Sequence, residues 1–128
     1  MAGSVSGAAG AGTTPAMDDG SVNWSTIYQF VFWSCRNEAC HGSGLAGVNF
    51  ATKDAAYETL LNKPANPNFE CAKLGKQRLV AGEPDESLLY LKLDINSPCG
   101  QQMPPGGLLS DEKRERVRQW IMNGAKND

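Results

Sequence analysis

Two cysteines and the only histidine of this chain lie within residues 35–41, Cys-Arg-Asn-Glu-Ala-Cys-His. A cysteine followed directly by a histidine is what covalent haem attachment needs. Two thiols add to the vinyl groups of the ring, and the adjacent imidazole then binds the iron. The usual spacing is C-x-x-C-H, whereas here four residues separate Cys35 from Cys40. We expect the extra pair to bulge outward, so that both sulfurs still reach the ring and His41 still lies beneath it.

A haem iron held by one histidine needs a second ligand or an open site, and the chain has no second histidine. Of its four methionines, two lie near the start of the chain and one lies on the last predicted helix. Met103 precedes Pro104 and Pro105, whose fixed φ angles stiffen the loop. It follows His41 by 103 − 41 = 62 residues, enough chain to return on the other face of a haem. We therefore predict His41 and Met103 as axial ligands, a pair that raises the reduction potential.

The length and composition indicate one ordinary folded domain. The chain has 128 residues, 41% hydrophobic and 20% charged, and its net charge of −2 does not favour binding to nucleic acid. Residues 1–22 are rich in Gly, Ala and Ser and predict a flexible tail or linker, serving either as a tether to a membrane anchor or as a solubilising segment. Residues 23–128 form the predicted domain.

Helical periodicity predicts an all-α fold of about four short helices joined by long loops. The predicted helices span residues 23–34, 52–62, 84–93 and 110–123, with a short extended piece at 77–81. Asn23 or Ser25 caps the first helix and Ser110 caps the last. The predicted buried positions are Ile27, Phe30, Val31 and Ser34 in the first helix, and Val117, Trp120 and Ile121 in the last. The basic run at 113–118 is expected to be a solvent-exposed helix face, and glycines 42, 44 and 47 predict a tightly turning loop.

From Asn23 to Ala125 the chain resembles a small single-haem cytochrome c of class I, most nearly the cytochrome c-like domains of exported bacterial proteins. The likeness is carried by five segments: the helix that leads into Cys35, the Cys40-His41 pair, residues 78–90 (RLVAGEPDESLLY), residues 99–104 (CGQQMP) and residues 120–125 (WIMNGA).

This resemblance implies one covalently attached haem c and one-electron transfer without enzymatic chemistry on a substrate. It also implies that Cys35 and Cys40 form the thioethers, that His41 is the proximal ligand and that Met103 is the distal ligand. The first and last helices of such a domain pack against each other, with Phe30 and Trp120 expected at the crossing. Some relatives in this family have widened cysteine spacings.

Cys71 and Cys99 lie on either side of the third predicted helix. A disulfide between them would close a loop of about 28 residues, contribute about 3–4 kcal/mol and limit the movement of the Met103 loop. The alternative is a pair of free buried thiols. We expect the disulfide.

Three other functions remain open at the level of sequence. Cys35 and Cys40 could form a short disulfide in a haem-less binding module of an exported protein. They could join His41 in a zinc site, although an adjacent Cys-His pair rarely fits one tetrahedron. A haem peroxidase would need polar distal groups, and only Gln101 and Gln102 are available near Met103.

Four cysteines in a small domain favour an oxidising compartment. We therefore expect a periplasmic or extracytoplasmic protein, with a lipid anchor as an open alternative, although no export signal is visible in residues 1–20. Its expected partner is a redox protein, and we expect the protein itself to be a monomer.

Overall fold

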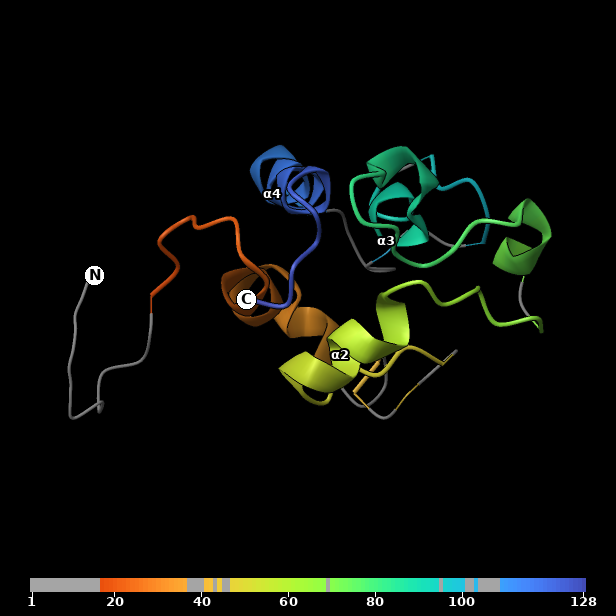
Figure 1. Ribbon diagram of the computed structural model, residues 1–128, viewed down its shortest axis with the longest axis horizontal. Coiled ribbons are helices and arrows are strands. Elements are labelled where there is room, and N and C mark those ends of the chain that lie inside the picture. Colours follow the sequence, from red (N-terminus) through yellow and green to blue (C-terminus); the bar gives the residue numbers. More distant parts are fainter. Residues whose placement is uncertain are drawn as a thin grey trace.

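Short helices joined by long connections make up nearly all the regular structure (Figure 1). The computed structural model describes residues 17–36, 41–42, 44, 47–68, 70–94, 96–100, 103 and 109–128. The α-helices are α1 (Trp24–Thr26), α2 (Lys53–Leu60), α3 (Leu88–Leu91) and α4 (Asp111–Met122). A π-helical turn spans Ile27–Val31, and 3₁₀ turns span Trp33–Arg36, Glu70–Leu74 and Pro84–Glu86. Within these ranges β-structure is limited to isolated bridges, so the predicted all-α class is confirmed.

The first helical segment begins where the sequence predicts. The side chain of Asn23 accepts a hydrogen bond of 2.8 Å from the backbone N–H of Thr26, which satisfies a donor that the helix leaves unpaired. After α1 the backbone widens into the π-helical turn, in which Phe32 donates to the carbonyl of Ile27. The segment ends at Arg36, so it carries the chain up to and past Cys35.

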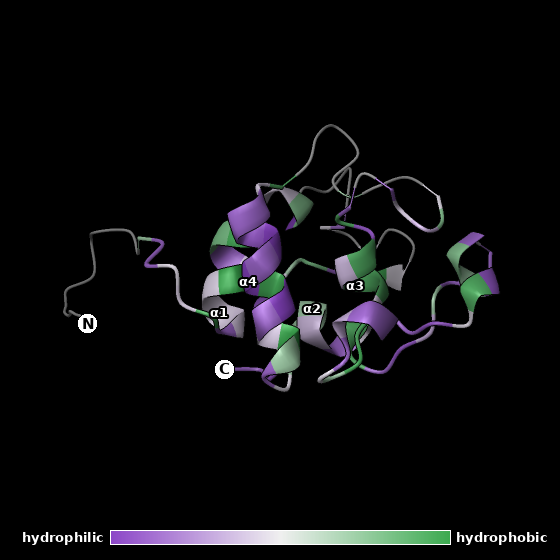
Figure 2. Ribbon diagram, turned by 90° about the horizontal axis from the view of Figure 1, so that it is seen from above, coloured by the Kyte–Doolittle hydropathy of each residue, from purple (hydrophilic) through white to green (hydrophobic). Residues whose placement is uncertain are grey.

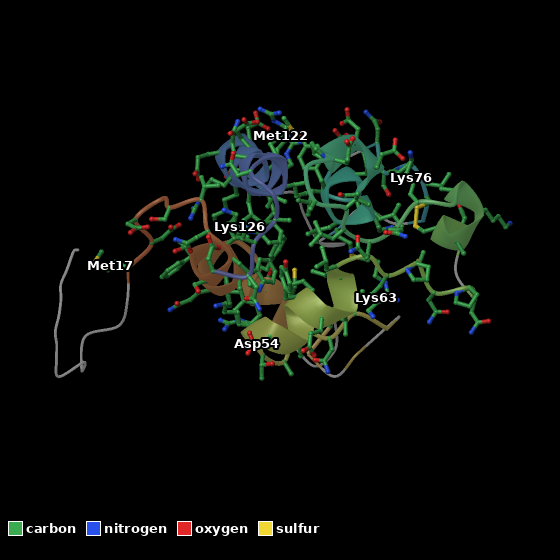
Figure 3. All side chains as sticks on the ribbon, in the orientation of Figure 1. Met17, Asp54, Lys63, Lys76, Met122 and Lys126 are labelled. Atoms are coloured by element: carbon green, nitrogen blue, oxygen red, sulfur yellow. A yellow bond between two sulfur atoms is a disulfide. The ribbon has the colours of Figure 1, made fainter. Side chains whose placement is uncertain are left out.

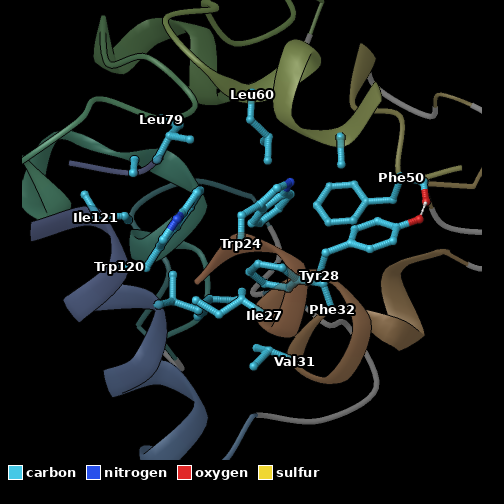
Figure 4. Packing of buried hydrophobic residues seen from close by; sticks show 14 residues of the cluster. Trp24, Ile27, Tyr28, Val31, Phe32, Phe50, Leu60, Leu79, Trp120 and Ile121 are labelled. Carbon is cyan, nitrogen blue, oxygen red and sulfur yellow. Dashed lines mark hydrogen bonds between the residues drawn. The ribbon is translucent and has the colours of Figure 1, made fainter. Parts of the chain in front are cut away.

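The π-helical turn changes which aromatic residue meets α4. Buried side chains of this segment recur at intervals of four, at residues 24, 28 and 32 and at residues 27 and 31. Trp24 stacks on Trp120, with ring centroids 4.7 Å apart and planes 18° apart (Figure 4). Phe30 is only half-buried, because the wider turn shifts the apolar face away from the three-and-four spacing of a regular helix. The predicted packing of the first and last helices is therefore present, but its aromatic contact is Trp24 with Trp120, not Phe30 with Trp120.

Helix α4 has the predicted ends and the predicted buried face. Ser110 caps it by accepting from the N–H of Lys113, and Gly124 follows its end with a φ of 109°. Val117, Trp120 and Ile121 are buried. The first half of the helix, residues 111–116, is entirely hydrophilic, and much of α4 is purple in the hydropathy colouring (Figure 2). The prediction that the basic run at 113–118 is exposed to solvent is wrong at Arg116, which is 5% exposed.

Helix α2 supplies the opposite wall of the core. Thr52 caps it by accepting from the N–H of Ala55, and Ala56 and Leu60 are buried. Just beyond α2, Leu61 forms a bridge to Leu79 in the predicted extended piece. In both overall views the Glu70–Leu74 turn lies at the end of the molecule opposite residues 17–22 (Figures 1 and 2).

Candidate functional site

Cys35 and His41 are joined through their backbones. The N–H of His41 donates to the carbonyl of Cys35 at 3.1 Å. In a C-x-x-C-H segment the histidine follows the first cysteine by four positions, the separation that a helical N–H to C=O bond joins. Here the first cysteine and the histidine are still bonded although the histidine follows by six positions, so the insertion does not pull the two ends of the motif apart. Cys40, which the sequence predicts as the second thioether, lies outside the described residues.

His41 is held by a short network of contacts around Phe50. The carbonyl of His41 accepts from the N–H of Phe50 at 2.7 Å, and their rings lie 6.0 Å apart between centroids. The carbonyl of Phe50 in turn accepts from the hydroxyl of Tyr28 at 2.8 Å, as drawn in Figure 4. Since Phe50 and Tyr28 belong to the buried core, the half-buried His41 is fixed to that core from one side.

The loop after His41 turns where glycine is required. Gly44 and Gly47 have φ angles of 91° and 84°, in the left-handed region that side chains with a Cβ avoid. A Cβ on Gly47 would lie 2.5 Å from Nη2 of Arg78. Nη1 of Arg78 donates to the carbonyls of Gly47 at 3.1 Å and of Thr59 at 2.7 Å, which joins this loop to α2. Burial lowers the pKa of the Arg78 guanidinium, which these carbonyls help to solvate.

Met103 lies at the edge of the same core. Its side chain is half-buried and packs against the buried cluster, as does that of Cys35. The backbone N–H of Met103 donates to the carbonyl of Lys92 at 2.6 Å. The residues on both sides of Met103 lie outside the described residues. They include Pro104 and Pro105, which are predicted to stiffen the loop, and the polar pair Gln101 and Gln102.

The predicted disulfide between Cys71 and Cys99 is confirmed, with a Cα–Cα distance of 5.1 Å, and Figure 3 shows its sulfur–sulfur bond. Cys99 is buried, whereas Cys71 is half-buried in the turn of Glu70–Leu74. The ammonium of Lys92 lies over this bond, 2.7 Å from the carbonyl oxygen of Cys99 and 3.6 Å from Sγ of Cys71. Burial lowers the pKa of Lys92, and the nearby carboxylate of Glu70 opposes that shift.

The donor set suits a covalently bound haem. Cys35 supplies a thiol, His41 an imidazole and Met103 a thioether, the groups that hold c-type haem. The first two are bonded through their backbones, and both Cys35 and Met103 pack on the core that also contacts His41. The residues present therefore fit the group.

A zinc site would need several ligands to converge. Among the residues with described positions, no group of three or more His, Cys, Asp or Glu side chains gathers closely enough to hold a metal ion. Cys40, one of the ligands considered for zinc, is not in this set. A surface hollow of about 240 Å³ lies elsewhere, lined by Tyr90, Leu91, Asp94, Asn96, Pro98 and Arg114, and includes none of the predicted haem-binding residues.

The sequence did not single out three basic residues that the structure makes important. Arg78 joins the His41 loop to α2, Lys92 joins the disulfide to Met103, and Arg116 forms a two-pronged ion pair with Asp18, both N–O distances being 2.8 Å. Each contact is long-range in sequence or made by a backbone carbonyl. Periodicity alone therefore could not have found them, and only the residue type gave a weak signal.

Comparison with known proteins found no family model, no curated protein and no solved structure that matches this chain. In the part of the chain that the structure describes, no helix is both long enough and apolar enough to cross a bilayer.

Proposed function

We propose that this protein is an electron carrier of the cytochrome c type, with one haem attached through Cys35 and Cys40 and bound axially by His41 and Met103. When bound, the haem would supply an iron that gains one electron from a reduced redox protein and loses it to an oxidised one. The chain's own residues would hold and orient the group and shield it from water. No bond of a substrate is made or broken, so we propose no enzymatic activity.

The observation that carries this proposal is the backbone bond between His41 and Cys35. It keeps the backbone of His41 next to that of Cys35, despite the widened spacing. The side chains of Cys35 and Met103 pack against the same buried cluster, which adds support.

The disulfide supports the proposed compartment. A bond between Cys71 and Cys99 persists only where thiols are not kept reduced, which favours a periplasmic or other extracytoplasmic location. It is equally compatible with a haem-less, disulfide-stabilised binding module, so this bond does not choose between the two functions. The visible spectrum of the protein distinguishes the two functions.

The test is a visible spectrum of the full chain produced with a haem-attachment system, recorded oxidised and reduced, followed by a haem stain on a denaturing gel. We expect sharp bands in the reduced protein and haem retained on the gel. A weak far-red band in the oxidised protein should vanish in Met103→Ala and persist in Met122→Ala, a matched variant at an exposed position of α4. A colourless protein with two disulfides by mass would refute the proposal and favour the binding module.

A further inference from the structure

One residue, Lys92, contacts both ends of the segment that leads from the disulfide to Met103. Its side-chain ammonium donates to the carbonyl of Cys99 at 2.7 Å, and its own carbonyl accepts from the N–H of Met103 at 2.6 Å. It lies directly after α3, and its N–H donates back to the carbonyl of Leu88. Residues 99 and 103 are therefore both fastened to the end of one helix.

The surroundings of the ammonium show why the contact is specific. Lys92 is half-buried, and a cationic group in such a place has to find acceptors to offset lost hydration. The carbonyl of Cys99 is one acceptor, and it also receives the hydroxyl of Ser97 at 2.8 Å. Gly100 follows Cys99 directly, and a Cβ there would lie 3.4 Å from Nζ, which is an ordinary contact distance.

We propose that Lys92 is the positioning residue of Met103, joining the Cys71–Cys99 disulfide to the loop that presents the thioether. The proposal rests on the proposed function for the role of Met103 as ligand. In it, the disulfide fixes Cys99, the ammonium fixes the Cys99 carbonyl to the end of α3, and the Lys92 carbonyl fixes Met103 to the same place. The proposed role of Lys92 is exerted through Met103 alone.

The test is Lys92→Met in the haem-bearing full chain, which removes the donor and keeps most of the apolar stem. We expect hydrogen exchange of the Met103 amide to become about tenfold faster, the equivalent of about 1.4 kcal/mol at that site. The far-red band should also be lost at lower temperature than in the parent protein. Lys92→Arg, which keeps a donor, should restore part of both. Lys73→Met is the control, since Lys73 is an exposed lysine in the turn that carries Cys71.

A second background tests the link to the disulfide. In Cys71→Ser, Cys99→Ser protein, Lys92→Met should have a smaller effect, because the Cys99 carbonyl is no longer held in place. The same effect in both backgrounds would overturn the link. Unchanged exchange and an unchanged band in Lys92→Met, relative to Lys73→Met, would overturn the positioning role while leaving the proposed function intact. Absence of haem from the parent protein and from Lys73→Met would instead overturn both.

Discussion

The ion pair between Asp18 and Arg116 provides a sharp test of how the start of the described chain is held. The guanidinium donates to both carboxylate oxygens of Asp18 at 2.8 Å, and also to the carbonyl of Ser21 at 3.3 Å. Its side chain is 6% exposed, whereas that of Asp18 is 31% exposed. Asp18→Asn keeps the shape of the partner and removes its charge.

The expected cost follows from this intermediate burial. Removing one partner of a fully buried pair costs about 3–5 kcal/mol, and exposed pairs contribute less than about 1 kcal/mol. Here Arg116 is buried but Asp18 is partly solvated, and Glu112 remains 3.6 Å from Nε of Arg116. We therefore expect Asp18→Asn to lower the free energy of unfolding by about 1.5 kcal/mol, between those limits.

Acidity gives the same interaction an independent signature. The hydrogen bond from Arg116 holds the pKa of Asp18 below its usual value, against the opposing effect of burial. A carboxyl whose pKa is lower in the folded state contributes its full stability above the unfolded pKa of about 3.9, and this contribution is lost as the pH falls through the folded pKa. Asp18→Asn should therefore differ from the parent at pH 7 and approach it in acid.

The assay is urea unfolding of the haem-bearing protein at pH 7 and at a series of acidic pH values. Asp19→Asn is the matched control, because Asp19 is an exposed neighbour whose carboxylate accepts from the N–H of Ser21 and makes no ion pair at contact distance in the described residues. It should change stability much less. Equal stabilities of the two variants at pH 7, or a difference between Asp18→Asn and the parent that does not shrink in acid, would refute the argument.

Three further changes test other contacts. Replacing Cys71 and Cys99 by serine should lower the free energy of unfolding by about 3.5 kcal/mol, because the disulfide joins residues 28 positions apart. Guanidinium unfolding measures this loss, and a value below about 1 kcal/mol would contradict the loop-entropy reasoning. Gly47→Ala should lower the free energy of unfolding by about 1–2 kcal/mol in urea unfolding, because φ at this position is 84° and the new Cβ would meet the guanidinium of Arg78. An unchanged free energy would show that this loop relaxes to accept the side chain. Trp120→Ala should lower the free energy of unfolding, measured by thermal unfolding, by about 3–5 kcal/mol, since Trp120 is 2% exposed and stacks on Trp24. A loss below about 1 kcal/mol would show that this stack is not a major part of the core.

Local chemistry explains which parts of the fold the sequence predicted well. Asn23 and Ser110 cap their helices as expected, because an N-cap depends on residues only two or three positions away. Gly124 similarly follows α4 with a positive φ. The Cys71–Cys99 disulfide could also be predicted, since these are the two cysteines that remain once Cys35 and Cys40 are assigned to the haem motif.

Long-range contacts explain the failures. Arg116 was expected in solvent because its partner, Asp18, lies 98 residues away in a segment with the composition of a tail. Phe30 was expected to be buried because the prediction assumed a regular helical repeat, which the π-helical turn breaks, and the resemblance then placed it at the helix crossing. Within the candidate site, the sequence supplied the donor types, but the positions of His41 and Met103 depend on Phe50 and on the Lys92 carbonyl.

The first helical turn is completed by residues at the far end of the chain. Asp128 accepts from the backbone N–H groups of Trp24 and Ser25, across more than 100 residues, and the Ala125 carbonyl accepts from the hydroxyl of Tyr57. Contacts of such separation form late, since nearly all of the chain must be present before they close. We therefore expect the segment that leads to Cys35 to reach its final packing only after α4 has docked. The Cys35 thiol would then stay accessible to the factors that modify it until this contact has formed.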